Sequence, residues 1–324
     1  MNRNERITLT DTPYNGSGKQ KKHEVSFKYL LLLLVTSMLM INNLNWSQTI
    51  PIKMERNKTI LPVRIGNSNE MKIILDSGMA FDGLLVYNPD LSDSIKLDNP
   101  IQVQIPGAGD GEPSKGIMDD SASFFVGDFE FKNQRVILLT SNTYRGFPTD
   151  GVIGYSILGH YTTEINYDNE KIILHNPIEF EVPDNWDSIP IYFKRNQIPW
   201  IDVSIAVENE ETVMISTYID FASGDMIELL EKDSMKFRLP EELTESYLGR
   251  GLSGDIYGRT GKITKLIIGS YELNDVDAAF TQGNTRSKQE NADGIIGNNA
   301  LRRFNLIFDY YNKFLHVKPN KYLN

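Results

Sequence analysis

Short apolar runs separated by turn residues fill most of the chain. The runs are rich in Ile, Val, Phe and Tyr and are bounded by Gly, Asn, Asp and Pro, as in the segments ILPVRIG, KIIL, WIDVSIAV and KITKLIIG. Such runs are typical of β-strands joined by tight turns. The helices that the pattern predicts are few and short, at residues 155–160, 226–232, 240–247 and 298–304. We therefore expect an all-β protein.

The pattern also repeats within the chain. Residues 150–177 match residues 293–320 at a constant offset of 143, and seven of these 28 positions are identical. Upstream of each block lies a strand–turn–strand pattern, with its turn at Gly127 in one copy and at Gly269 in the other. A fixed period between matching blocks is the mark of a duplicated structural unit.

A third pair of matching blocks lies further upstream. An apolar run ends at Asp76 in one copy and, 144 residues later, another ends at Asp220. Because the order and spacing of all three pairs are kept, we infer a duplicated domain. Acids and proline interrupt the apolar pattern at residues 179–188, which we interpret as the link between the copies. We therefore assign one lobe to residues 49–180 and the other to residues 181–324.

The chain begins with a polar, lysine-rich leader and an apolar run at residues 29–41. This layout is that of an export signal, and the run is shorter than the roughly 20 residues that a membrane span needs. We assign residues 1–48 to the leader and expect an exported protein, in the cell envelope or periplasm or secreted. The alternatives are an uncleaved membrane anchor, which would tether the protein through residues 29–41, and a buried core helix.

Composition excludes several classes of function. The net charge of −10 and the scattered acids leave no basic stripe for nucleic acid. The chain has no cysteine, which excludes disulfides, thiolate metal sites and a cysteine nucleophile. Its four histidines are dispersed, so we expect no metal centre and no cofactor. No G-x-S-x-G motif of a serine hydrolase is present.

The clearest candidate chemistry is the segment Leu75-Asp76-Ser77-Gly78, which directly follows an apolar run. A strand that ends in Asp-Ser-Gly presents a carboxylate at its exit. Glycine lets the backbone turn sharply there, and the serine hydroxyl can hydrogen-bond to a partner across the turn. About 70 residues later each copy has two apolar residues and a glycine, at residues 152–154 and 295–297, before a short predicted helix.

An aspartate turn followed by an apolar-apolar-glycine strand resembles a lobe of the pepsin and retropepsin-like aspartic peptidases. The segment ADGIIGNNAL at residues 292–301 is especially similar to the one that closes the retropepsin core. The resemblance covers about residues 50–320 and is closest to the two-lobed bacterial members. It implies two six-stranded-type β-barrel lobes with a central cleft, and we expect a monomer.

The resemblance also implies a mechanism, with Asp76 and Asp220 as catalytic residues supported by Ser77, Gly78 and Ser223. Two carboxylates about 3 Å apart cannot both ionise cheaply, so they share a proton. The charged carboxylate takes a proton from a water held between them, and the protonated one polarises the substrate carbonyl. The implied activity is endopeptidase cleavage of extended peptides or proteins, which are the expected partners.

Each lobe should also carry a β-hairpin flap that closes over the substrate. In the second copy this is the glycine-rich segment 249–261, with Gly254 near its tip and Tyr257 as a ring to cover the cleft. The counterpart at residues 106–116 contains Gly109 and no aromatic residue. Ordinary exposed loops are the alternative interpretation of both segments.

The second aspartate turn departs from the family pattern. It reads Asp220-Phe221-Ala222-Ser223-Gly224, where the family has Asp-Thr-Gly or Asp-Ser-Gly. Phe221 has no hydroxyl, and Ala222 adds a methyl where glycine leaves room; Ser223 could supply the hydroxyl only if the turn is rearranged. The alternative function is therefore a catalytically inactive envelope protein that keeps the fold and binds a peptide or glycan.

Overall fold

The computed structural model describes residues 46–323, apart from residues 80, 92–93, 110, 143, 195 and 283–290. The apolar run at residues 29–41, and with it the expected export signal or membrane tether, lies outside the described residues. In the part of the chain that is described, no helix is long and apolar enough to cross a membrane. The folded unit begins at Trp46, so that Ser47 and Gln48, which we expected in the leader, open the first strand.

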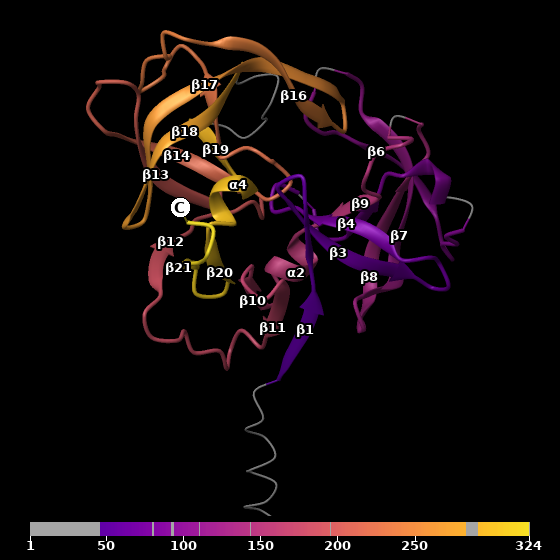
Figure 1. The fold of residues 1–324 in the computed structure, drawn as a ribbon. Coiled ribbons are helices and arrows are strands. Elements are labelled where there is room, and N and C mark those ends of the chain that lie inside the picture. Colours follow the sequence, from indigo (N-terminus) through magenta and orange to yellow (C-terminus); the bar gives the residue numbers. More distant parts are fainter. Residues whose placement is uncertain are drawn as a thin grey trace, which may run out of the picture. The chain divides into compact units, whose positions relative to one another are not determined.

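The described chain is nearly all strand, as the apolar runs predict (Figure 1). The first half contains β1 (Ser47–Pro51), β2 (Lys53–Glu55), β3 (Lys58–Ile65), β4 (Met71–Leu75), β5 (Leu84–Val86), β6 (Ile101–Ile105), β7 (Ser114–Val126), β8 (Phe129–Leu139), β9 (Gly151–Ile153), β10 (Thr162–Asn166) and β11 (Lys171–His175). The second half contains β12 (Asp187–Pro190), β13 (Trp200–Ala206), β14 (Val213–Asp220), β15 (Ile227–Glu231), β16 (Thr244–Gly251), β17 (Gly254–Ile268), β18 (Tyr271–Gln282), β19 (Gly294–Gly297), β20 (Phe304–Asp309) and β21 (Phe314–Pro319). The helices of the described residues are the 3₁₀ turn η1 (Pro89–Leu91) and the short α2 (Tyr155–Leu158) in the first half, and the short α4 (Asn298–Leu301) in the second.

The two halves have the same strand order, which confirms the duplicated fold. One sheet runs β3-β4-β9-β5-β8-β7-β6, with β2 added at its edge, and the other runs β13-β14-β19-β15-β18-β17-β16. Apart from β2, each strand of the first sheet has its counterpart at the same place in the second. An additional pairing curls each sheet back on itself, β3 with β7 and β13 with β17.

The strand that ends at each aspartate is held in the interior of its sheet. β4 pairs in parallel with β9, and β14 pairs in parallel with β19. The strands that follow the aspartate turns pair antiparallel with the same crossing strands, β5 with β9 and β15 with β19. The chain therefore leaves the sheet at the aspartate, turns, and returns on the far side of the crossing strand.

A third sheet joins the two halves. Its order is β1-β11-β10-β20-β21-β12, with three strands from each half, and β10 pairs with β20 at its centre. Both halves contribute to one apolar core, which includes Leu75, Ile153, Ile219 and Phe308. The two halves are therefore packed together through a shared sheet and a shared core.

Two of the four predicted helices are strands. Residues 226–232 contain β15, and residues 240–247 contain the start of β16. β15 is buried along most of its length because it lies between β18 and β19. An apolar run that is buried on both faces has no alternation, so periodicity cannot separate a central strand from a buried helix. The other two predicted helices are confirmed as the shorter α2 and α4.

The aspartate that opens each long repeat block ties the sheet together. Asp150 Oδ2 accepts a hydrogen bond from Lys72 N at 2.7 Å, and Asp293 Oδ2 accepts one from Ser216 N at 3.0 Å. Asp293 is 4% exposed and also lies 2.7 Å from Lys232 Nζ. Burial raises the pKa of this carboxyl, but the hydrogen bonds from Lys232, Ser216 and Lys236 outweigh burial and hold its pKa below 3.8.

We predict that Asp293→Asn lowers the free energy of unfolding by about 2 kcal/mol at neutral pH, because the lysine ion pairs are lost. A depressed carboxyl pKa stabilises the folded state above the unfolded pKa and stops doing so as pH falls through the folded pKa. The difference between wild type and variant should therefore shrink as pH falls below 3.8. Urea unfolding at several pH values measures it, and a constant difference would contradict this assignment.

Candidate active site

The first aspartate turn follows β4. Gly78 N donates a hydrogen bond to Asp76 Oδ1 at 2.8 Å, and Asp76 N donates to Ile153 O at 2.8 Å. The carboxylate is thus fixed from its own turn, and the backbone before it is fixed by the crossing strand β9. The side chain of Asp76 is half-buried.

The second aspartate turn has the same hydrogen bond to its carboxylate. Ala222 N donates to Asp220 Oδ1 at 2.8 Å, as Gly78 N does to Asp76. Ser223 N donates to the same oxygen at 3.1 Å and shares its hydrogen with Asp220 O, also at 3.1 Å. Asp220 is 8% exposed. The unusual sequence of this turn therefore keeps the hydrogen bond seen in the first turn and adds one from Ser223 N.

The structure brings the two turns together. A Cβ atom at Gly78 would lie only 3.0 Å from Asp220 Cγ, so glycine is what lets the first turn approach the second carboxyl group. The buried Ser77 hydroxyl donates to Ile219 O at 2.7 Å and accepts from Phe221 N at 3.2 Å. A single side chain from the first turn thus binds the backbone on both sides of Asp220.

Phe221 does not return this interaction. Its ring is fully buried and packs against Phe308 of β20, with ring centroids 5.3 Å apart. Ser223 is buried as well, and the described hydrogen bonds of its hydroxyl stay within its own turn, to Asp225 at 3.4 and 3.5 Å. Neither side chain makes a described hydrogen bond to the first lobe. The Ser77 hydrogen bonds to the second lobe, which we call the serine grip, therefore have no described equivalent in the other direction, and the grip is one-sided.

Other first-lobe residues support the second turn instead. Lys58 Nζ donates a hydrogen bond to Ala222 O, and Asn57 Nδ2 donates to Gly224 O at 3.2 Å. Both residues come from the tight turn between β2 and β3. Asn298 of α4 is fully buried and donates to Asn57 O at 2.9 Å, which clamps this turn against the second half.

Two β-hairpins correspond to the expected flaps, β6–β7 and β16–β17, and their tips are hydrogen-bonded to each other. Gly111 N donates to Ser253 O at 2.6 Å, and Ser253 N donates to Ala108 O at 2.9 Å. Ser114 Oγ donates to Leu252 O at 2.6 Å. These bonds join the flap of one lobe to the flap of the other.

The flap joint is also packed with apolar side chains. Leu252 contacts a first-lobe cluster that includes Met79, Ile105 and Tyr144, and Ala222 of the second aspartate turn packs against the same cluster. The Tyr144 hydroxyl donates to Gly251 O, and burial raises the pKa of Tyr144 well above its usual value. The flap tip and the second aspartate turn therefore pack against the same apolar cluster of the first lobe.

Of the predicted flap residues, Gly109 and Gly254 lie at the joint and Tyr257 does not. A Cβ at Gly109 would lie 2.6 Å from Gly254 N, so these two backbones are in close contact. Tyr257 lies on the stem of its hairpin, is 66% exposed, and packs edge-on against Tyr247. The flap residue that packs against the first-lobe apolar cluster is Leu252, not the aromatic ring that we expected to cover the cleft.

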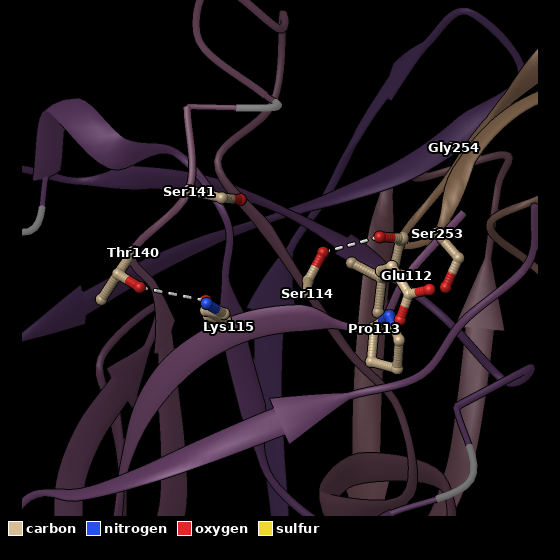
Figure 2. Close-up of a pocket in the computed structure, with 9 residues that line it drawn as sticks. Glu112, Pro113, Ser114, Lys115, Thr140, Ser141, Ser253 and Gly254 are labelled. Atoms are coloured by element: carbon tan, nitrogen blue, oxygen red, sulfur yellow. Dashed lines mark hydrogen bonds between the residues drawn. The ribbon is translucent and has the colours of Figure 1, made fainter.

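Two cavities border these elements, and neither is lined by Asp76 or Asp220. One, of about 380 Å³, lies beside the flap joint and is lined by Ser114 and Thr140 of the first lobe and by Ser253 and Gly254 of the second (Figure 2). The other, of about 1180 Å³, is bordered by Gly224 at the second aspartate turn and by the stems of β17 and β18.

A polar cluster fastens the chain after the first aspartate turn. Asp82 accepts a hydrogen bond from Ser156 Oγ at 2.6 Å and lies 2.6 Å from His160 Nε2. The hydrogen bond to Asp82 raises the pKa of His160 despite its partial burial. Because the carboxylate lies between the other two groups, the imidazole does not contact the hydroxyl and cannot activate it as in a serine hydrolase. The cluster is a tether between this loop and α2.

Comparison with known proteins adds no family to this geometry. No protein-family model matches the chain, and no curated protein is significantly similar to it. Among the described residues, no three His, Asp or Glu side chains are grouped so that they could bind a metal ion.

Sequence reasoning missed several residues of the site. Asn57 lies in the turn between β2 and β3 and Lys58 opens β3; the second sheet has no strand at the place of β2, so the internal repeat does not mark these residues. Ser114 and Tyr144 contact a flap that is more than 100 residues away in the chain. The one available signal was the glycine-rich composition of both flap segments, which is consistent with backbones in close contact.

We predict that Ser77→Ala lowers the free energy of unfolding by about 3 kcal/mol, because it leaves a buried carbonyl and a buried N–H without their partner. Ser77→Thr keeps the hydroxyl and should retain most of the stability. Ser223→Ala is the matched control in the other turn, and it should cost less than about 1 kcal/mol because the bonds it removes are long. Equal losses for both alanine variants, measured by urea unfolding, would contradict the one-sided grip.

We predict that Gly107→Ala prevents the flap tips from joining, because the added Cβ would lie 2.4 Å from Leu252 Cβ. Amide hydrogen exchange at Gly111 and Ser253 should become at least about tenfold faster, since their bonds across the joint are broken. Gly146→Ala is the control for a strained substitution outside the flap joint, because its φ of 77° disfavours alanine while nothing lies within 4 Å of the position of its Cβ. Unchanged exchange in Gly107→Ala would show that the tips are not joined in solution.

Proposed function

We propose that this protein is an exported aspartic endopeptidase that hydrolyses extended peptides with a water activated between Asp76 and Asp220. The observation that carries the proposal is the Ser77 hydroxyl, which binds the backbone on both sides of Asp220. A contact of this kind holds two carboxylate turns face to face. The same strand order around both aspartates supports the proposal, because each carboxylate then leaves its sheet at an equivalent place.

The chemistry follows from two carboxyl groups that share one proton. The ionised carboxylate accepts a proton from the water, and the resulting hydroxide attacks the peptide carbonyl. The protonated carboxyl donates a hydrogen bond to the carbonyl oxygen as negative charge develops there. The proton taken from water is then passed to the leaving amine. Neither carboxylate forms a covalent bond to the substrate.

The proposed substrate is a peptide in extended conformation that lies beneath the two flaps. Gly78 and Ala222 flank the aspartates, and Leu252 with Met79 supplies an apolar surface close by. Opening of the flap joint admits the peptide, and closure excludes bulk water, which strengthens the electrostatic interactions in the site.

A second function is favoured by the side chains of the second turn. Phe221 occupies the position of the family's second hydroxyl, and Ala222 adds a methyl at the position that is glycine in the first turn. A protein that keeps the fold, has lost catalysis and binds a peptide or glycan in the envelope would tolerate both residues. Binding of a statine-type inhibitor or peptide without cleavage between pH 2 and 8, a range spanning roughly the ordinary carboxyl and histidine pKa values, would favour this function.

We predict that the purified protein cuts denatured protein at acid pH and is blocked by a statine-type inhibitor. Asp76→Asn and Asp220→Asn should each lower kcat/KM at least about a thousandfold, since the pair acts as one acid–base unit. Asp128→Asn is the control, because its side chain is fully exposed in the turn between β7 and β8. Cleavage that survives Asp76→Asn would refute the proposed mechanism.

A further inference from the structure

Lys58 is connected to Asp220 through a single peptide group. Its ammonium donates a hydrogen bond to Ala222 O, and the N–H of that same peptide group belongs to Ser223. Ser223 N donates to Asp220 Oδ1 at 3.1 Å. A cation on the carbonyl end polarises the peptide and makes its N–H a stronger donor, so the effect of the ammonium reaches the carboxylate.

The position of Lys58 is set by its surroundings. The turn that carries it has Arg56 and Asn57 at positive φ, 50° and 61°, which is the tight two-residue turn of a β-hairpin. Asn57 binds Gly224 O on the second aspartate turn, and Asn298 binds Asn57 O from behind. Nζ also lies 3.9 Å from the position of a Cβ at Gly224. The hairpin that carries Lys58 is therefore fastened to the second aspartate turn next to the carbonyl that the ammonium binds.

We propose that Lys58 is a positioning residue for Asp220. It supports the second aspartate turn in place of the hydroxyl that Phe221 lacks, and it makes Asp220 the ionised member of the aspartate pair. This inference rests on the proposed function and deepens it, because it assigns unequal roles to the two aspartates. Asp220 then acts as the base toward water, and Asp76 is the protonated group that faces the substrate carbonyl.

Other ionisable groups face the same turns and must be included in the balance. They are Asp76 on the first turn, Asp225 on the second turn, Tyr87 at the end of β5, which interacts with Asp76, and Arg303, which contacts Met226. Asp76 and Asp225 are carboxyl groups like Asp220, and like charges on neighbouring carboxylates repel one another. A cation at Lys58 offsets that repulsion from a position opposite the carboxylate, on the far side of the peptide group.

The test is the pH dependence of kcat/KM in Lys58→Gln, which keeps a donor for Ala222 O and removes the charge. The acid limb of the profile should move up by about one pH unit, because an anion that loses a nearby cation holds its proton more tightly. Lys58→Arg should leave the limb in place. Lys53→Met is the control, since it removes the same charge from an exposed site on the same hairpin.

A purely structural role would lower kcat/KM in Lys58→Gln without moving the limb, and that result would overturn the inference while leaving the proposed function intact. If the wild type shows no cleavage, the proposed function fails, and the inference is tested by NMR titration of the Asp220 carboxyl carbon instead. A midpoint about one pH unit higher in Lys58→Gln than in wild type supports the role of Lys58. Equal midpoints overturn it.

Discussion

The hydrogen bonds of the Ser77 hydroxyl are the interaction on which the candidate site depends. They connect Ile219 O and Phe221 N, on either side of Asp220, to the turn that carries Asp76. Burial makes them costly to lose, because neither backbone group has water to replace the hydroxyl. The Ser77 side chain therefore fixes the second aspartate turn relative to the first on both sides of Asp220, and Lys58, Asn57 and the shared six-stranded sheet add to this support.

The two lobes have the same architecture and different residues at their centre. In the first turn, glycine leaves room for Asp220 and serine grips the other lobe. In the second turn, the residue after the aspartate is a phenylalanine that packs into the core against Phe308. The support that a second hydroxyl would give comes instead from Lys58 and Asn57. A duplicated fold has thus become asymmetric at its functional centre, and an asymmetric pair is suited to two different roles.

Most of the fold and about half of the candidate site could be predicted from the sequence. Apolar runs and the internal repeat predicted the strands, the duplication and the two aspartate turns, because these depend on local pattern and constant spacing. The pattern misassigned residues 226–232, since a strand buried on both faces has no alternation to detect. Contacts across the lobes, such as Lys58 to Ala222 and Leu252 beneath the flaps, depend on tertiary packing and leave no periodic signal. Tyr257 was a reasonable aromatic candidate, but its place on the hairpin stem directs it to solvent.

The central claim is that Asp76 and Asp220 act on one substrate atom as a single unit. A crystal structure of the protein with a statine-type inhibitor tests this most directly, because the inhibitor's hydroxyl occupies the place of the attacking water. The account predicts that this hydroxyl lies within about 3 Å of an oxygen of each carboxylate. An inhibitor that binds beneath the flaps but contacts only one of the two carboxylates, or that binds outside the flaps, would contradict it.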